Sequence, residues 1–132
     1  HGWAALAHAA GDPVKEADVL HNLAEVCHRA GALDAALQGS LAAAERGTPR
    51  IRLAALANAA HVAARLGLRG EYERCLARCD AALPAHGLPY ERAQWLLTLA
   101  AACDAADDDR AASYRHRGLE LAWAHRFTEL LM

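Results

Sequence analysis

Residues 23–37 read Leu-Ala-Glu-Val-Cys-His-Arg-Ala-Gly-Ala-Leu-Asp-Ala-Ala-Leu, and they carry the clearest indication of the fold. Apolar residues on both sides of Gly31 recur every three or four positions, which is the spacing of one face of an α-helix. A glycine between two such patterns is typical of a helix end and a tight turn. The stretch therefore predicts two helices joined as a hairpin.

The composition of the whole chain also favours helices. Its 132 residues include 35 Ala and 20 Leu, but only 8 residues are Val, Ile or Thr. Ala and Leu are strong helix formers, whereas strands favour β-branched and aromatic residues. We therefore expect an all-α fold, in which many small side chains allow the helices to approach one another closely.

Prolines mark a regular period along the chain. Pro13, Pro49 and Pro89 each follow a glycine by two residues, and they are separated by 36 and 40 residues. A glycine closes one helix and a proline fits the first turn of the next. A period of about 35–40 residues with two helices is typical of a helical solenoid. We expect about seven helices, over residues 2–10, 13–30, 33–46, 49–66, 70–85, 90–106 and 108–124, and a last turn near 126–131.

Each expected helix has an apolar stripe that would face its neighbours. The stripe of the helix over 13–30 contains Val19, Leu20, Leu23, Val26, Cys27 and Ala30. The stripe of the helix over 70–85 contains Tyr72, Cys75, Leu76, Cys79 and Leu83.

We expect residues 1–132 to form a single helical-repeat domain. The repeat units are expected over residues 1–12 (partial), 13–48, 49–88 and 89–124, with a tail over 125–132. Because the first residue is His1 rather than Met, we expect the chain to be a fragment of a longer protein.

The stretch around Gly31 resembles the tetratricopeptide repeat (TPR), which alternates large and small apolar residues, has Gly at the turn and ends on Pro. In the unit over 13–48 these roles fall to Leu23, Ala24, Cys27, Gly31, Ala36, Ala43 and the following Pro49. The next unit offers Gly70, Tyr72, Cys75, Leu76, Ala82 and Pro89, with a first helix about three residues longer than the family pattern. The unit over 89–124 offers Leu99, Ala100, Cys103, Asp107, Ala112 and Leu119, with Asp107 where Gly is usual.

The resemblance implies a right-handed α-solenoid of antiparallel helix hairpins, in which the first helix of each unit lines a concave groove. A helical bundle with similar hairpins is the alternative fold. The family's geometry assigns the concave face to Asp18, His21, Asn22, Glu25, His28, Arg29, Asn58, His61, Arg65, Gln94, Thr98, Ala101 and Asp104. The alternative interpretation is that this is only a solvated helix face.

Charge and hydropathy exclude several classes of partner. The formal net charge is -2 and Arg alternates with Asp and Glu, so we expect no direct contact with nucleic acid. No stretch of 18 residues is both apolar and uncharged, and no signal peptide is visible. We therefore expect a cytoplasmic protein that does not bind membranes.

The residues that could carry chemistry do not form a recognisable site. Cys75 and Cys79 share a helix face and could form half of a zinc site, but core packing is the preferred interpretation. The eight His are scattered, and the run Asp107-Asp108-Asp109 fits helix N-capping better than a calcium loop. Trp95 is expected in the core or between repeats. We expect no catalytic residue, cofactor or bound metal.

These features predict a protein- or peptide-interaction or sensor module without enzymatic activity. The partner would be a protein, a peptide or another domain of the same chain. Such Ala- and Arg-rich segments are similar to the TPR regions of large bacterial transcription activators, which implies a regulatory context. The alternative is a structural spacer, or a self-association module that uses its exposed terminal helices.

Overall fold

The computed structural model describes residues 13–85 and 87–125, and the described part is helical without any strand. Its elements are α2 (Pro13–Arg29), α3 (Leu33–Arg46), α4 (Pro49–Leu66), α5 (Arg69–Ala82), the 3-10 turn η1 (Leu83–Ala85), α6 (Pro89–Ala105) and α7 (Ala111–Ala124). Helices make up 86% of the described residues, which confirms the all-α fold. The helix expected over 2–10 and the turn near 126–131 lie outside the described residues.

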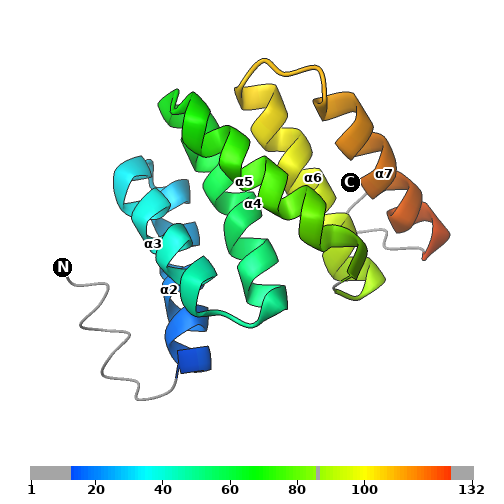
Figure 1. The fold of residues 1–132 in the computed structure, drawn as a ribbon. Helices are drawn as coiled ribbons and strands as arrows, with labels where there is room; N and C mark the ends of the chain where they lie inside the picture. Colours follow the sequence, from blue (N-terminus) through cyan, green and yellow to red (C-terminus); the bar gives the residue numbers. More distant parts are fainter. Residues whose placement is uncertain (1–12, 86, 126–132) are drawn as a thin grey trace.

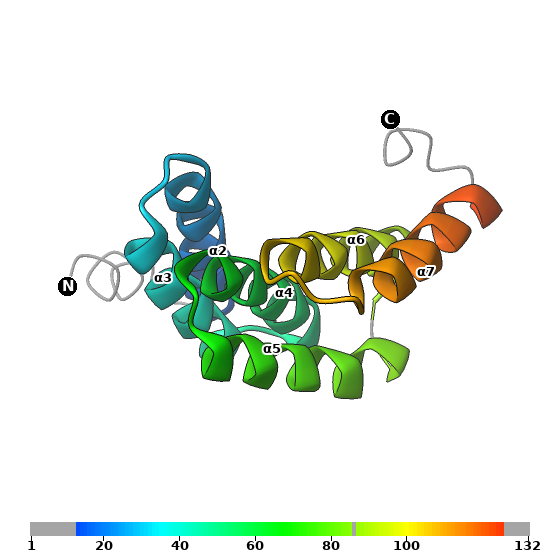
Figure 2. The same ribbon diagram turned by 90° about the horizontal axis from the view of Figure 1, so that it is seen from above.

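The helices follow one another in space in nearly the order of the chain (Figure 1). Pairs α2/α3, α3/α4, α4/α5 and α6/α7 pack as neighbours. The exception is α6, which follows α5 in the chain but packs mainly on α4; α5 lies below α4 and α6 in the view of Figure 2, and its Tyr72 hydroxyl reaches Cys103 of α6. As a result α2, α4 and α6 share one side of the molecule.

Helices α2, α4 and α6 begin and end alike. Each begins at a proline and closes 18 residues later, at Gly31, Gly67 or Asp107, the three residues of these turns with positive φ. The residue after each one donates its N–H to a carbonyl five positions back: Ala32 to Cys27, Leu68 to Ala63 and Asp108 to Cys103, at 2.8–2.9 Å. Asp107 therefore takes the conformation that glycine takes in the other two turns.

This shared geometry corrects the expected register of the second unit. The turn glycine is Gly67, with φ 74°, whereas Gly70 lies in the first turn of α5. Within this chain the three helices that begin at a proline differ little in length, because α4 has 18 residues against 17 in α2 and α6.

Three equivalent positions of α2, α4 and α6 form the core of the helix layer. They lie four, seven and eleven residues after the proline, and every residue at them is buried: Ala17, Leu53 and Ala93; Leu20, Leu56 and Leu96; Ala24, Ala60 and Ala100. Two of the three positions hold mostly alanine, which lets the helix axes come close.

The expected apolar stripe of α2 is therefore only partly right. Leu20 is buried, but Val19 and Val26 are 36% and 57% exposed and Ala30 is exposed. Leu23 and Cys27 are half-buried. The contact face of α2 contains the small residues Ala17 and Ala24. Small side chains allow close helix packing, but a pattern of large apolar residues does not indicate them.

The stripe of α5 is confirmed, because Tyr72, Cys75, Leu76, Cys79 and Leu83 are all buried. Trp95 is buried in the same cluster, as expected. The helix expected from residue 108 begins at Ala111, and in it Ala111 and Gly118 are buried, whereas Ala112 is exposed and Leu119 is half-buried. A Cβ atom at Gly118 would lie 2.9 Å from Leu97, so this position of α7 is in close contact with α6.

Candidate functional site: a polar groove on the α2, α4 and α6 side

Two adjoining depressions follow the side of the molecule that α2, α4 and α6 share. The first, of about 460 Å³, is lined by His21, Thr48, Arg50, Ile51, Ala54, Glu91, Gln94 and Trp95. The second, of about 390 Å³, is lined by His28, Asn58, His61, Gln94, Leu97, Thr98 and Ala101. Gln94 borders both, so we treat them as one groove with a Glu91 end and a histidine end.

The Glu91 end lies where α4 and α6 begin. Glu91 accepts the N–H of Leu88 at 2.9 Å and the Nε–H of Arg50 at 2.7 Å, and Arg50 also donates through Nη2. Burial raises the pKa of Glu91, but the hydrogen bonds from Leu88 and Arg50 outweigh it and leave the pKa below its ordinary value. Charge at this end is thus neutralised within the protein.

The histidine end joins α2 to α4. The rings of His28 and His61 meet edge to face with centroids 4.7 Å apart, and Asn58 hydrogen-bonds His28. Burial and the nearby charge of Arg65 lower the pKa of His28. Burial, His28 and Arg65 lower the pKa of His61 to about 4. The pair is therefore uncharged near neutral pH.

Two polar atoms in this groove are buried without a hydrogen-bond partner. They are Nδ1 of His21 and Nδ2 of Asn58. His21 uses its other nitrogen, Nε2, toward Glu25 at 3.2 Å, and the hydrogen bond from His21 lowers the pKa of Glu25. A buried polar group without a partner costs free energy, so native proteins rarely keep one without a use.

The expected concave-face residues fall into two groups in the structure. Six of them, together with Ala101, line the groove: His21, His28, Asn58, His61, Gln94 and Thr98. Arg65 lies close enough to lower the pKa of both histidines at its end. Asp18, Asn22 and Arg29 are exposed on α2 and are not among the lining residues, and Glu25 pairs with His21 and Arg29. Asp104 pairs with Arg115 of α7.

Sequence reasoning missed Arg50 and Glu91 as lining residues. A usable signal was present, because Glu91 follows Leu88 by three residues at the start of α6, where a carboxylate typically accepts the exposed N–H of the residue before the helix. Arg50 lies in the first turn of α4, directly after Pro49, as Glu91 lies in the first turn of α6 after Pro89.

A second polar cluster, the Asp108 cluster, joins α5 to the turn before α7. Asp108 accepts the hydroxyl of Tyr72 at 2.7 Å and the backbone N–H of Arg110 at 3.0 Å. The Arg110 guanidinium donates to Asp108 and to Glu73, both at 2.6 Å. The hydrogen bond from Arg110 holds the pKa of Asp108 well below its usual range. Burial and the bonds to Cys103 and Asp108 raise the pKa of Tyr72.

The expected capping role of the acidic run is thus corrected. No side chain caps the N-terminus of α7, whose first flanking residue is Arg110. Asp108 instead links the turn before α7 to Tyr72 of α5, which lies 36 residues earlier in the sequence.

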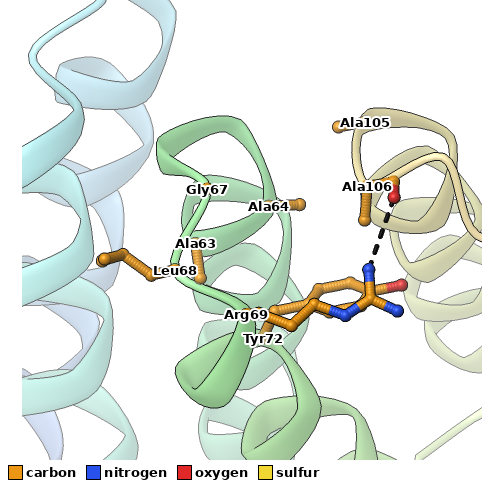
Figure 3. Close-up of a pocket in the computed structure, with 8 residues that line it drawn as sticks. All are labelled: Ala63, Ala64, Gly67, Leu68, Arg69, Tyr72, Ala105 and Ala106. Atoms are coloured by element: carbon orange, nitrogen blue, oxygen red, sulfur yellow. Dashed lines mark hydrogen bonds between the residues drawn. The ribbon is translucent and has the colours of Figure 1, made fainter.

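Beside this cluster lies a smaller cavity of about 220 Å³, between the α4–α5 turn and the end of α6 (Figure 3). Four of its eight lining residues are alanine, and Arg69 reaches across it to the carbonyl of Ala106 at 3.4 Å. The same guanidinium lies over the Tyr72 ring, 5.3 Å from its centroid. The cavity offers one cation that already has two protein partners, so it is a weaker candidate than the groove.

The cysteines contribute to packing. Cys75, Cys79 and Cys103 are buried, and Cys27 is half-buried. Burial raises the pKa of Cys75 to about 11 and that of Cys79 to about 12, so neither is a ready metal ligand or nucleophile. Within residues 13–85 and 87–125, no group of three His, Cys, Asp or Glu side chains is placed to hold a metal ion. None of the described helices is long and apolar enough to cross a membrane.

Comparisons of the chain with protein-family models, with curated proteins and with solved structures found no match.

Proposed function

We propose that this chain is an interaction module that binds a protein or peptide segment along the groove on the α2, α4 and α6 side. In this proposal the helix hairpins form a right-handed, TPR-like solenoid, and the chain works without catalysis as part of a larger regulator. The observation that carries the proposal is the unpartnered, buried Nδ2 of Asn58 in the wall of an open depression.

The chemistry of the groove suits a peptide. An extended peptide presents backbone N–H and C=O groups at regular intervals. The side-chain amides of Asn58 and Gln94 can each donate and accept, and the ring of His21 has a nitrogen still without a partner. A peptide carbonyl at Asn58 Nδ2 would therefore recover a hydrogen bond that the free protein lacks.

Several observations argue against a catalytic use of the same groove. Its lining residues include no cysteine or serine, and the hydroxyl of Thr98 donates to the carbonyl of Gln94 at 3.0 Å. The carboxylate of Glu91 is occupied by Arg50 and Leu88. Neither a nucleophile beside a base nor an unoccupied acid is present in the lining.

The test uses a synthetic library of random decapeptides, each made with a free and with an amidated C-terminus. We expect the 132-residue chain to select a subset with micromolar affinity, about -8 kcal/mol. A triple variant, His21→Ala, Asn58→Ala and Gln94→Ala, should weaken those peptides by at least about tenfold. The matched control changes three exposed residues of α3 and α5, Gln38→Ala, Glu45→Ala and Arg78→Ala, and should bind normally.

The proposal fails if no peptide is selected, or if the control variant loses binding while the groove variant keeps it. Circular dichroism of both variants separates lost binding from lost folding.

Self-association is the second candidate, and one observation favours it. Trp123, near the end of α7, is 69% exposed. Exposed tryptophan is common in interfaces, although Arg117 and Glu120 keep that part of α7 charged. Sedimentation velocity between about 5 and 500 µM tests this function: concentration-dependent dimerisation that disappears in Trp123→Ser would support it.

A further inference from the structure

The two ends of the groove differ in how their charge is balanced. At the Glu91 end, a carboxylate faces the cation of Arg50. At the histidine end, the lining residues include two histidines and three uncharged polar residues but no carboxylate. This end can therefore become positively charged, and none of its lining residues carries a negative charge that would balance it.

The charged groups around the histidine end can be assigned helix by helix. On α4, Arg65 acts on both histidines and lowers the pKa of each. On α2, Glu25 acts on His28 in the opposite direction, but its carboxylate is engaged by His21 and by Arg29. On α6, the residues that face the depression are uncharged: Gln94, Leu97, Thr98 and Ala101.

The available polar groups at this end are donors or can become donors. Nδ2 of Asn58 is a donor without a partner, and a protonated histidine donates from both ring nitrogens. A carboxylate accepts several such bonds at once, and bonds between charged partners are the strongest. Its negative charge would also compensate for the burial that keeps His28 and His61 neutral in the free protein.

We propose that the histidine end binds a carboxylate of the peptide partner and that the His28–His61 pair takes up a proton as it does so. The inference rests on the proposed function, because it specifies the partner of the same groove. The carboxylate can belong to an Asp or Glu side chain or to the C-terminus of the peptide. The Glu91 end would hold an uncharged part of the same segment.

Proton uptake gives this binding a defined pH dependence. The pKa of His61 is about 4 in the free protein against an ordinary value of 6.5. If the bound carboxylate restores the ordinary value, affinity falls by about tenfold between pH 5.5 and pH 7.5, from one linked proton. A neutral ligand would leave the affinity unchanged over this range.

The experiment takes the peptides selected by the wild-type chain and changes their carboxylates one at a time. Fluorescence polarisation at pH 5.5 and 7.5 compares each peptide with its Asp→Asn or Glu→Gln form and with its amidated C-terminal form. We expect at least a tenfold loss at pH 5.5 for one of these changes, and the affected form tells a side-chain carboxylate from a terminal one. Calorimetry in two buffers of different ionisation enthalpy should show uptake of up to one proton.

Variants of the protein locate the effect. In His61→Gln or His28→Gln, the pH dependence should shrink while a neutral peptide binds as before. His116→Gln on the exposed surface of α7 is the matched control, and it should keep the full tenfold dependence. The peptide comparisons use the wild-type chain, so they test the carboxylate proposal even if a histidine substitution unfolds the protein.

The outcomes separate the two proposals. Selected peptides that tolerate every carboxylate change, or that bind equally at both pH values, would overturn the carboxylate inference and leave the peptide-binding function standing. A preference for basic peptides would overturn it as well. If no decapeptide binds, both proposals fail.

Discussion

The Asp108 cluster and the histidine end of the groove are both polar clusters between helices, but they differ in how their hydrogen bonds are used. In the Asp108 cluster, the carboxylate of Asp108 is 6% exposed and accepts hydrogen bonds from Tyr72 and Arg110. Arg110 also donates a hydrogen bond to Glu73. In the histidine end, Asn58 has a buried donor with no partner and the two histidines are held neutral. One cluster is complete within the protein, and the other is not.

This difference helps to distinguish polar clusters that stabilise the fold from those that can bind a ligand. A satisfied buried network stabilises the fold and leaves nothing for a ligand. An unsatisfied group lowers stability unless a partner completes it, so it is the better candidate for binding. The predictions below test this division by comparing the two clusters, in order of the size of the expected effect.

The largest effect is expected for Asp108→Ala. The change removes the acceptor of Tyr72 and of Arg110 and leaves both donors partly buried, so we expect a loss of about 2–4 kcal/mol in the free energy of unfolding. Urea denaturation measures it. The neighbouring exposed residue provides the control, because Asp109→Ala should change stability by no more than about 0.5 kcal/mol. Equal effects of the two changes on the free energy of unfolding would show that Asp108 has no special structural role. Peptide binding should be unaffected in both variants.

A smaller loss is expected for Tyr72→Phe. The hydroxyl donates to Asp108 and lies 3.2 Å from Cys103 Sγ, but Arg110 still binds that carboxylate after the change, so we expect a loss of about 1 kcal/mol. Tyr114→Phe is the comparison, since its hydroxyl bonds the exposed residue Asp80 and should matter less. Thermal unfolding of the two single variants and of wild type ranks them, and a larger loss in Tyr114→Phe would contradict the assignment.

The helix boundaries and half of the groove could be predicted from sequence because both depend on local signals. Pro49 and Pro89 fix where the first helices begin, and residues equally spaced from them, such as Asn58 and Thr98, fall on the same side. The sequence could also indicate that Asp107 stands at a glycine position.

The rest of the fold and of the groove depends on which helix packs against which. A repeat pattern in the sequence does not contain that information. Val19 and Val26 have the spacing of buried residues, yet the contact face of α2 is formed by Ala17 and Ala24. The bond between Tyr72 and Asp108 joins residues 36 positions apart, and only the packing of α5 beside the turn before α7 creates it. The same holds for Arg50 and Glu91, which are 41 positions apart.

The two clusters should also lose stability in different pH ranges. The unfolded chain protonates His61 near 6.5 and the folded chain only near 4, so the free energy of unfolding should fall as pH drops from 6.5 toward 4 and level off below it. Asp108 contributes in a lower pH range. Its pKa in the folded protein lies below the ordinary 3.8, so its contribution to the free energy of unfolding is complete above that value and is lost only in stronger acid.

Urea unfolding at half-unit pH steps tests this separation. His61→Gln should flatten the upper range, and Asp108→Asn should flatten the acid range. Glu25 and Glu91, whose pKa values are lowered from 4.5, add to the lower range in both variants and in wild type. A profile of His61→Gln that matches wild type above pH 5 would show that the histidine end does not titrate as described.

The smallest effect on stability, with the largest effect on binding, is expected for Asn58→Leu. Leucine has nearly the same shape, and the change removes one hydrogen bond to His28 together with an unpartnered buried donor. These two contributions oppose each other, so the free energy of unfolding should change by less than about 1 kcal/mol. The pKa of His28 should fall further, since the bond that His28 donates to Asn58 raises it, and a proton NMR titration of the ring measures this. Peptide affinity should drop by at least about tenfold.

The matched control is Asn22→Leu, because both asparagines lie nine residues after the proline of their helix, but Asn22 is exposed on α2 and does not line the groove. It should change neither binding nor the titration of His28. If Asn58→Leu cost as much stability as Asp108→Ala, Asn58 would be a structural residue, and the division between a complete and an incomplete cluster would not hold. An unfolding free energy that stays constant while binding is lost would mean that the buried amide is kept for its ligand, since the fold gains nothing from it.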